Sequence, residues 1–169
     1  DGSLPSYHTM TWTSGNEFIT AMYNRIYYQI GICNEYIRET SDEKLVSRGI
    51  TSPEIKMYRA EARFLRALSY YHALDMFGSV PFVTEKDAVG SFLPKQITKA
   101  DLFTYIESEL KAIEVDMAEP RKNEYARADK AAAWTLLTKL YLNAEVYIGA
   151  GKYTEAITSA KKVIGAGYV

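Results

Sequence analysis

The sequence predicts an all-α protein in which antiparallel helix pairs stack into a right-handed superhelix. Apolar residues recur at three- and four-residue spacing over most of the 169 positions, and polar or glycine-containing breaks separate these runs. No segment alternates between apolar and polar residues convincingly enough to indicate a sheet. Hydrophobic residues make up 47% of the chain and charged residues 24%, the balance of a globular protein. We therefore expect residues 1–169 to form a single helical scaffold.

The first two helices are predicted over about residues 15–39 and 53–77, on either side of a polar break at 41–52. Pro53 suits the first turn of the second helix. Backbone N–H groups in that turn have no partner within the helix, so the lack of an N–H in proline removes no hydrogen bond. Gly78 is a typical residue to follow a helix C-terminus. In the first helix the positions that keep helical spacing are Phe18, Met22, Tyr23, Ile26, Ile30, Cys33 and Ile37.

Residues 79–97 contain two prolines and predict a long extended connection. Loops of this length are usually functional or packed onto another part of the molecule. A third helix is predicted from Thr98 to about Ala118. Thr98 is its expected N-terminal cap, with Asp101 three residues further on as in a weak capping box.

A polar stretch at residues 120–128 precedes the last two predicted helices. Asp129 is the expected N-terminal cap of the fourth helix, which runs from Lys130 to about Ile148. Two glycines at 149 and 151 then turn the chain into a fifth helix over about residues 152–165.

The last two helices show the spacing of a tetratricopeptide repeat. Trp134-x2-Leu137-x3-Tyr141 reproduces the large–Leu–Tyr pattern of a first repeat helix. Small residues at a helix crossing let two helices approach, while large side chains fill the groove between them. The pattern of a second repeat helix is supplied by Tyr153, Ala156, Ala160 and Val163.

The same spacing occurs earlier in the chain, in Phe64-x2-Ala67-x3-Tyr71. The two copies lie about two periods of about 34 residues apart, which favours a repeat architecture. A generic helical bundle is the alternative, because such spacing also arises by chance. The insertion at residues 146–150 is the weakest part of the repeat pattern.

Charge and cysteine content exclude several classes of protein. Lys and Arg total 20 against 21 Asp and Glu, so the net charge of −1 argues against a nucleic-acid partner. No run approaches the roughly 18 apolar residues of a membrane-spanning helix. One cysteine, Cys33, excludes an internal disulfide and a multi-cysteine zinc site. The chain opens DGSLPSYH and closes AGYV, from which we expect a fragment of a longer protein.

Residue types that carry catalysis are scarce and scattered. His8 and His72 are the only histidines, and His72 lies in an apolar helix, where a packed role fits better than that of a base. Cys33 lies on the inward face of its helix, without a base to activate its thiol. There is no glycine-rich phosphate loop and no His/Asp metal cluster, so we predict a non-catalytic protein without cofactor or metal. A carboxylate pair for glycoside hydrolysis is not indicated, because the candidates lie on different faces of one helix: Glu107, Glu109 and Glu114.

A basic stripe on the second helix is formed by Arg59, Arg63 and Arg66, at four- and three-residue spacing. The stripe either meets an anion or pairs with glutamates of a neighbouring helix, and pairing is the simpler interpretation.

Aromatic residues are abundant, with 14 Tyr, 6 Phe and 2 Trp. Tyr7 and Trp12 stand in the irregular segment before the first helix and are the candidate ligand contacts. Exposed aromatic faces stack against the apolar C–H patches of sugar rings, and polar groups at the rim orient the sugar. We interpret the tyrosines of the first helix as wedges between stacked helices: Tyr23, Tyr27, Tyr28 and Tyr36.

The run YRAEARFLRALSYY at residues 58–71, followed by LDMFGSVP at 74–81, resembles the signature of the SusD/RagB family of outer-membrane glycan-binding lipoproteins. Residues 114–134 are most similar to the starch-binding branch. The resemblance covers nearly the whole chain and continues through FTYIESEL at 103–110, RADKAA at 127–132 and YLNA at 141–144.

The resemblance implies a lipid-anchored protein on the external face of the outer membrane. Family members cap a SusC-type TonB-dependent transporter and bind an oligosaccharide without cleaving it. Their tetratricopeptide-like helices form a scaffold that lies against the transporter, and this chain corresponds to that scaffold. The family's arc of glycan-binding aromatics comes mainly from segments before and well after these helices, and the resemblance assigns no residue here to it. Cys33 lies within a helix and therefore does not correspond to the lipid-bearing cysteine of the family.

Two classes of function therefore stay open. The first is a scaffold segment of a glycan-uptake lipoprotein, with starch or another α-glucan as its ligand. The second is a free-standing tetratricopeptide adaptor that binds a protein or peptide. A hydrolase is a distant third.

Overall fold

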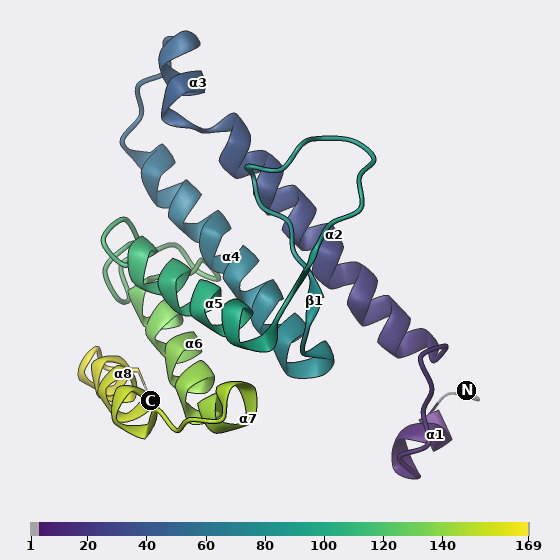
Figure 1. The fold of residues 1–169 in the computed structure, drawn as a ribbon. Coiled ribbons are helices and arrows are strands. Elements are labelled where there is room, and N and C mark those ends of the chain that lie inside the picture. The colour runs from purple at the N-terminus through teal and green to yellow at the C-terminus, as the bar shows by residue number, and fades with distance from the viewer. Residues whose placement is uncertain (1–3, 169) are drawn as a thin grey trace.

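The computed structural model describes residues 4–168, and the regular secondary structure in this part of the chain is almost entirely helical (Figure 1). The only sheet in this range is a two-residue antiparallel pair, in which Val80 is opposite Ile97. The helices are α1 (Leu4–His8), α2 (Glu17–Glu39), α3 (Asp42–Ser47), α4 (Glu54–Phe77), α5 (Lys99–Ile113), α6 (Lys130–Leu142), α7 (Ala144–Ile148) and α8 (Tyr153–Gly165), and the strands are β1 (Val80–Pro81) and β2 (Gln96–Ile97).

The helices pack as neighbouring pairs, as the repeat pattern predicts. The most extensive contacts join α2 to α4, α4 to α5, and α6 to α8. In Figure 1 successive long helices run back and forth beside one another, with α1 standing apart beyond the start of α2. The predicted fold class, antiparallel helix pairs of tetratricopeptide type, is confirmed.

The buried side chains form one cluster that connects α2, α4, α5, α6, α7, α8 and β1. The positions of the earlier copy of the repeat pattern lie in it: Ala67 is fully buried, and Phe64 and Tyr71 are 8% exposed. In the later copy Leu137 and Tyr141 are buried, whereas Tyr153 is 51% exposed. The small residue at 67 lets neighbouring helices approach, because a larger side chain would have to displace the packed core.

Helix ends follow the predicted chemistry. The Thr98 side chain accepts a hydrogen bond from Asp101 N, and the Asp129 carboxylate accepts from Ala131 N and Ala132 N. Gly78 ends α4 with φ 74°, and Gly149 ends α7 with φ 71°, a conformation that L-residues rarely adopt.

Four details of the prediction are wrong. The segment before α2 is not wholly irregular, because Tyr7 lies in the short helix α1. The polar break at 41–52 contains helix α3, capped by Ser41. The third helix ends at Ile113, five residues early. The helix predicted over 130–148 is two helices, because the chain turns at Asn143, and the insertion at 146–150 falls in α7 and the turn after it.

The first part of the connection between α4 and α5 is packed onto the helices, which is one of the two roles expected for a loop of this length. Tyr27 Oη donates to Pro81 O at 2.8 Å, and Asn34 Nδ2 donates to Val83 O at 3.2 Å. Tyr70 Oη both donates to Val83 O at 2.6 Å and accepts from Val83 N at 2.9 Å. Burial raises the pKa of Tyr70 to about 12, so its phenol keeps the donated proton at neutral pH.

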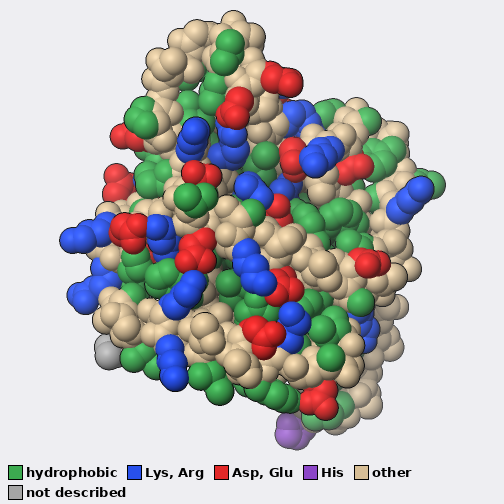
Figure 2. All heavy atoms as spheres, turned by 60° about the vertical axis from the view of Figure 1, so that its left-hand side comes forward, with side chains coloured by type: hydrophobic (Ala, Val, Ile, Leu, Met, Phe, Trp, Pro, Cys, Tyr) green, Lys and Arg blue, Asp and Glu red, His purple; other side chains and the backbone are tan. Residues whose placement is uncertain are grey.

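The arginine stripe pairs with carboxylates, which confirms the simpler interpretation. Arg63 and Arg66 both bind Glu109 of α5, and Arg59 binds Asp42 of α3. Figure 2 shows acidic and basic side chains interspersed over one face of the molecule. No helix within residues 4–168 is both long enough and apolar enough to span a bilayer.

Candidate ligand-binding pocket at the start of helix α2

Asn16 organises the segment that leads into α2. Its Oδ1 caps the helix by accepting from Phe18 N at 3.0 Å and from Ile19 N at 3.3 Å. The same oxygen accepts from Tyr7 Oη at 3.0 Å, and Asn16 Nδ2 donates to Ser6 Oγ at 3.3 Å. One capping residue therefore fixes the position of α1 relative to α2.

Tyr7 and Trp12 stack on each other in this segment. Their ring centroids lie 5.7 Å apart at an interplanar angle of 24°, and Phe18 packs at a tilt on Tyr7 with centroids 6.2 Å apart. Trp12 keeps 46% of its surface exposed. Tyr7 thus covers one face of an indole that remains accessible from the other side.

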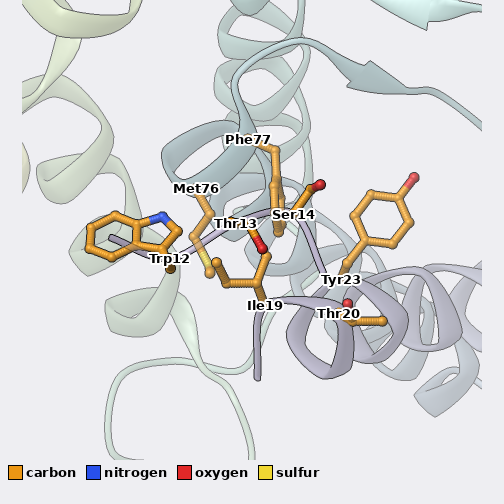
Figure 3. Close-up of a pocket in the computed structure, with 8 residues that line it drawn as sticks. All are labelled: Trp12, Thr13, Ser14, Ile19, Thr20, Tyr23, Met76 and Phe77. Atoms are coloured by element: carbon orange, nitrogen blue, oxygen red, sulfur yellow. The ribbon is translucent and has the colours of Figure 1, made fainter. Parts of the chain in front are cut away.

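A pocket of about 530 Å³ opens between this segment and the end of α4. Trp12 lies at one end of the pocket and Tyr23 at the other, with Ile19, Met76 and Phe77 between them (Figure 3). The lining residues come from the coil before α2, the first two turns of α2 and the last turn of α4: Trp12, Thr13, Ser14, Ile19, Thr20, Tyr23, Met76 and Phe77.

Hydroxyls supply the polar surface of the pocket, and none of its lining residues is charged. Within the described part of the chain, the side-chain oxygens of Thr13, Ser14 and Thr20 make no hydrogen bond, and all three residues are exposed. Tyr23 packs on Tyr27, with ring centroids 4.7 Å apart, and edge-on against Phe77 at 5.4 Å. Aromatic surface with a few polar groups is the composition of small-molecule sites.

The structure separates the two predicted ligand contacts. Trp12 forms a wall of the pocket, whereas Tyr7 is not among the lining residues and lies behind Trp12. Sequence reasoning missed Tyr23, Met76 and Phe77 as pocket residues. Their helical spacing indicated only packing, and nothing local predicts that the end of α4 meets the coil before α2.

The tyrosines interpreted as wedges behave differently along α2. Tyr23, Tyr27 and Tyr36 are partly buried, but Tyr28 is 73% exposed, so the wedge interpretation is wrong for Tyr28. Burial and the neighbouring Tyr23 raise the pKa of Tyr27, which keeps its phenol protonated as a donor to Pro81.

A second cavity, of about 770 Å³, lies among charged side chains between α2, α3, α4 and α5. Arg66 is its most buried member, 2% exposed. Arg66 Nη2 donates to Glu109 at 2.9 Å, and Arg66 Nη1 donates to Asn34 at 2.8 Å and to Glu85. Burial opposes the charge on Glu109, but hydrogen bonds from Arg63 and Arg66 outweigh it and hold the pKa of Glu109 below its ordinary value. All the arginine and lysine side chains that line this cavity except Lys86 are paired with carboxylates.

Most residues considered for catalysis are engaged in packing or ion pairs, whereas His8 is exposed at the end of α1. Cys33 is 4% exposed, and burial raises the pKa of its thiol. Glu107 accepts from Tyr141 Oη at 2.8 Å, and Glu114 accepts from Lys162 at 3.0 Å. His72 is partly buried against Tyr71. Across residues 4–168 no group of three or more His, Cys, Asp or Glu is arranged to hold a metal ion.

Comparison with known proteins places this fold among glycan-binding proteins. Residues 3–142 match the model of the SusD-like_3 family, described as starch-binding and associating with the outer membrane. The chain is 41% identical over 165 residues to the starch-binding protein SusD of Bacteroides thetaiotaomicron. That alignment covers 98% of this chain and 28% of SusD, so the chain spans little more than a quarter of its relative.

Solved structures share the fold at low sequence identity. A SusD superfamily protein from Parabacteroides distasonis matches with a TM-score of 0.79 and 21% identity, over 96% of this chain and 34% of that one. A SusD-like carbohydrate-binding protein from Bacteroides fragilis matches with a TM-score of 0.76 and 22% identity, over 93% and 29%. A laminarin-binding SusD-like protein matches with a TM-score of 0.67 and 24% identity, over 86% and 30%.

Proposed function

The chain belongs to the SusD-like family, and from this membership we propose that it is the helical scaffold of a non-catalytic glycan-binding protein at the outer membrane. The proposed ligand is starch or another α-glucan, because the named relative at 41% identity is a starch-binding protein. The proposed partner is a SusC-type TonB-dependent transporter on which the helices pack. In this role the protein takes up oligosaccharides without cleaving them and needs no cofactor.

The observation that carries the scaffold role is an uncovered apolar face on α8. Tyr153, Ile157 and Ile164 are 51%, 57% and 70% exposed and follow one another at helical spacing. Contiguous exposed apolar side chains of this kind support a scaffold role, in which other protein packs against α8.

The proposed location is the external face of the outer membrane, held by a lipid anchor. Cys33 does not carry that anchor, because its side chain is buried inside the helix bundle. Anchoring is proposed for a part of the protein other than these helices, and the principal glycan contacts are proposed to lie outside this chain as well.

Binding measurements on two forms of the protein test this proposal. The protein as the cell makes it and the 169-residue chain are compared by affinity electrophoresis in gels with and without starch. We expect strong retardation of the native protein and little or none of the isolated chain. A native protein that binds no glycan would contradict the function, and strong binding by the isolated chain would place the principal site within these helices.

Purification from outer membranes under mild detergent tests the partner. A tagged native protein should retain a TonB-dependent barrel, and the double variant Ile157→Glu, Ile164→Glu should retain less of it. In the isolated 169-residue chain the same double variant should leave the helices folded, because both side chains are exposed there. Recovery of a soluble peptide or protein partner in place of a barrel, with no starch binding, would favour the free-standing adaptor instead.

A further inference from the structure

We propose that the pocket between Trp12 and Tyr23 is an auxiliary sugar subsite that binds one or two rings of a neutral oligosaccharide. The inference rests on the proposed glycan-binding function and adds a contact surface within the helical scaffold itself. In this subsite Trp12 is the stacking residue, and Tyr7 is a positioning residue that acts through Trp12.

The indole of Trp12 is arranged as a platform before any ligand arrives. Tyr7 stacks on it at 5.7 Å, and the Tyr7 hydroxyl is tied to the Asn16 cap at 3.0 Å. A ring supported on one face loses little freedom when a sugar covers the other, which lowers the entropic cost of binding. The 46% exposure of Trp12 leaves the surface that such stacking requires.

The hydroxyls of Thr13, Ser14 and Thr20 are suited to orient the sugar. None of them is hydrogen-bonded to another described residue, so a ligand has no protein contact to displace. Each hydroxyl both donates and accepts, which matches the hydroxyl groups of a pyranose. Thr20 projects from the first turn of a long, capped helix, and its position is therefore fixed by the backbone.

The absence of charge among the lining residues selects the ligand class. A uronic acid or sulfated sugar would lose hydration in this pocket without gaining a cation. Five of the six cationic side chains that line the large charged cavity are already paired with carboxylates, and that cavity lies among other elements. A neutral glycan is therefore the chemistry that the pocket fits.

The size of the pocket agrees with a short saccharide segment. Its volume of about 530 Å³ falls within the range of small-molecule sites, about 300–1,000 Å³. One stacking residue and a few hydroxyls give weak binding, with a dissociation constant of roughly 1–10 mM. Such affinity is compatible with the weak or absent retardation expected of the isolated chain in starch gels.

Tryptophan fluorescence measures this site directly. The chain has two tryptophans, so Trp134→Phe leaves Trp12 as the only indole. The Lys162 Nζ atom lies 5.1 Å from the centroid of the Trp134 ring, and phenylalanine keeps an aromatic ring at that position. Titration of this variant with maltotriose should change the Trp12 emission with a millimolar midpoint, and trigalacturonic acid should not.

Amide NMR spectra of the full 169-residue chain locate the binding. Maltotriose should shift the resonances of residues 12–23 and 76–77, and Trp12→Ala should weaken binding at least tenfold. Thr20→Val, which keeps the side-chain shape without the hydroxyl, should weaken it several-fold. Tyr125→Ala is the matched control, because Tyr125 is a fully exposed aromatic outside the pocket and its variant should bind maltotriose like the parent chain.

Three outcomes would overturn the subsite: no response to maltotriose at 50 mM, equal response to the acidic sugar, or unchanged binding by Trp12→Ala. If the native protein still binds starch in any of these cases, the proposed function stands and only the subsite is wrong. If the native protein binds no glycan, the proposed function fails instead.

Discussion

The guanidinium of Arg66, buried in α4, donates a 2.9 Å hydrogen bond to the carboxylate of Glu109 in α5. Arg63, one turn earlier in α4, donates to the same carboxylate at 2.7 and 3.1 Å. These bonds join two helices that otherwise meet through buried apolar side chains. Arg66 and Glu109 are both largely withdrawn from water, so the loss of Glu109 leaves Arg63 without a carboxylate partner and Arg66 with Glu85 alone.

Replacement of Glu109 by glutamine should destabilise the fold strongly. Glu109→Gln removes the charge shared by two arginines, which leaves Arg63 without a carboxylate partner and buried Arg66 with Glu85 alone. The expected loss is about 3–5 kcal/mol in the free energy of unfolding, measured by urea denaturation. Glu35→Gln is the control, since the Glu35 side chain is 54% exposed in its pair with Arg38 and should cost less than about 1 kcal/mol. Equal losses in the two variants would contradict this assignment.

Low pH should reduce the free energy of unfolding through protonation of Glu109. The pKa of Glu109 is lower in the folded state than its ordinary value, so folding stabilises the ionised form. The contribution of Glu109 to the free energy of unfolding is fully present above the pKa of this group in the unfolded chain, about 4.3. It is lost as the pH falls toward the lower pKa of the folded state. We expect a flat free energy of unfolding from pH 7 to about 5 and a decline below about pH 4, with a shallower decline in Glu109→Gln. A steeper acid limb in the variant would refute the linkage.

Two neighbouring tyrosines of the core should respond differently to loss of the hydroxyl. Tyr70→Phe removes the hydroxyl oxygen that accepts a hydrogen bond from Val83 N. The free energy of unfolding should fall by about 1–3 kcal/mol. The substitution should also increase proteolysis of the connection after β1. Tyr105→Phe should be neutral or stabilising, because Tyr105 Oη is buried without a partner among the described residues. Urea denaturation of both variants checks the contrast, and comparable losses would be incompatible with it.

Alanine should have opposite effects at two glycines. Gly31 lies inside α2 and is exposed, and a Cβ added there would meet no atom within 4 Å, so Gly31→Ala should stabilise by about 0.5–1 kcal/mol. Gly78 has φ 74°, and its Cβ would lie 3.0 Å from Lys99 Cε, so Gly78→Ala should destabilise by about 1–3 kcal/mol. Thermal unfolding measures both, and stabilisation by Gly78→Ala would refute the strain argument.

The elements recovered from sequence are those with strong local signals. Thr98 and Asp129 cap helices where their short polar side chains predict it, and Gly78 ends α4. The elements that were missed, α1 and α3, are five and six residues long and bury no side chain, so they leave no apolar periodicity. The turn at Asn143 was missed because apolar residues continue on both sides of it.

The sequence by itself determined the helical class, the pairing of the helices, the repeat spacing around Ala67 and the family resemblance. These features depend on the order of residues along a helix, which periodicity and capping express locally. Only the tertiary structure decided that Trp12 and Phe77 line the same pocket, that Tyr7 stacks on the indole of Trp12, and that Glu109 pairs with two arginines. Such relationships join residues far apart in the chain, because helix crossings and the path of a loop arise from packing of the whole core.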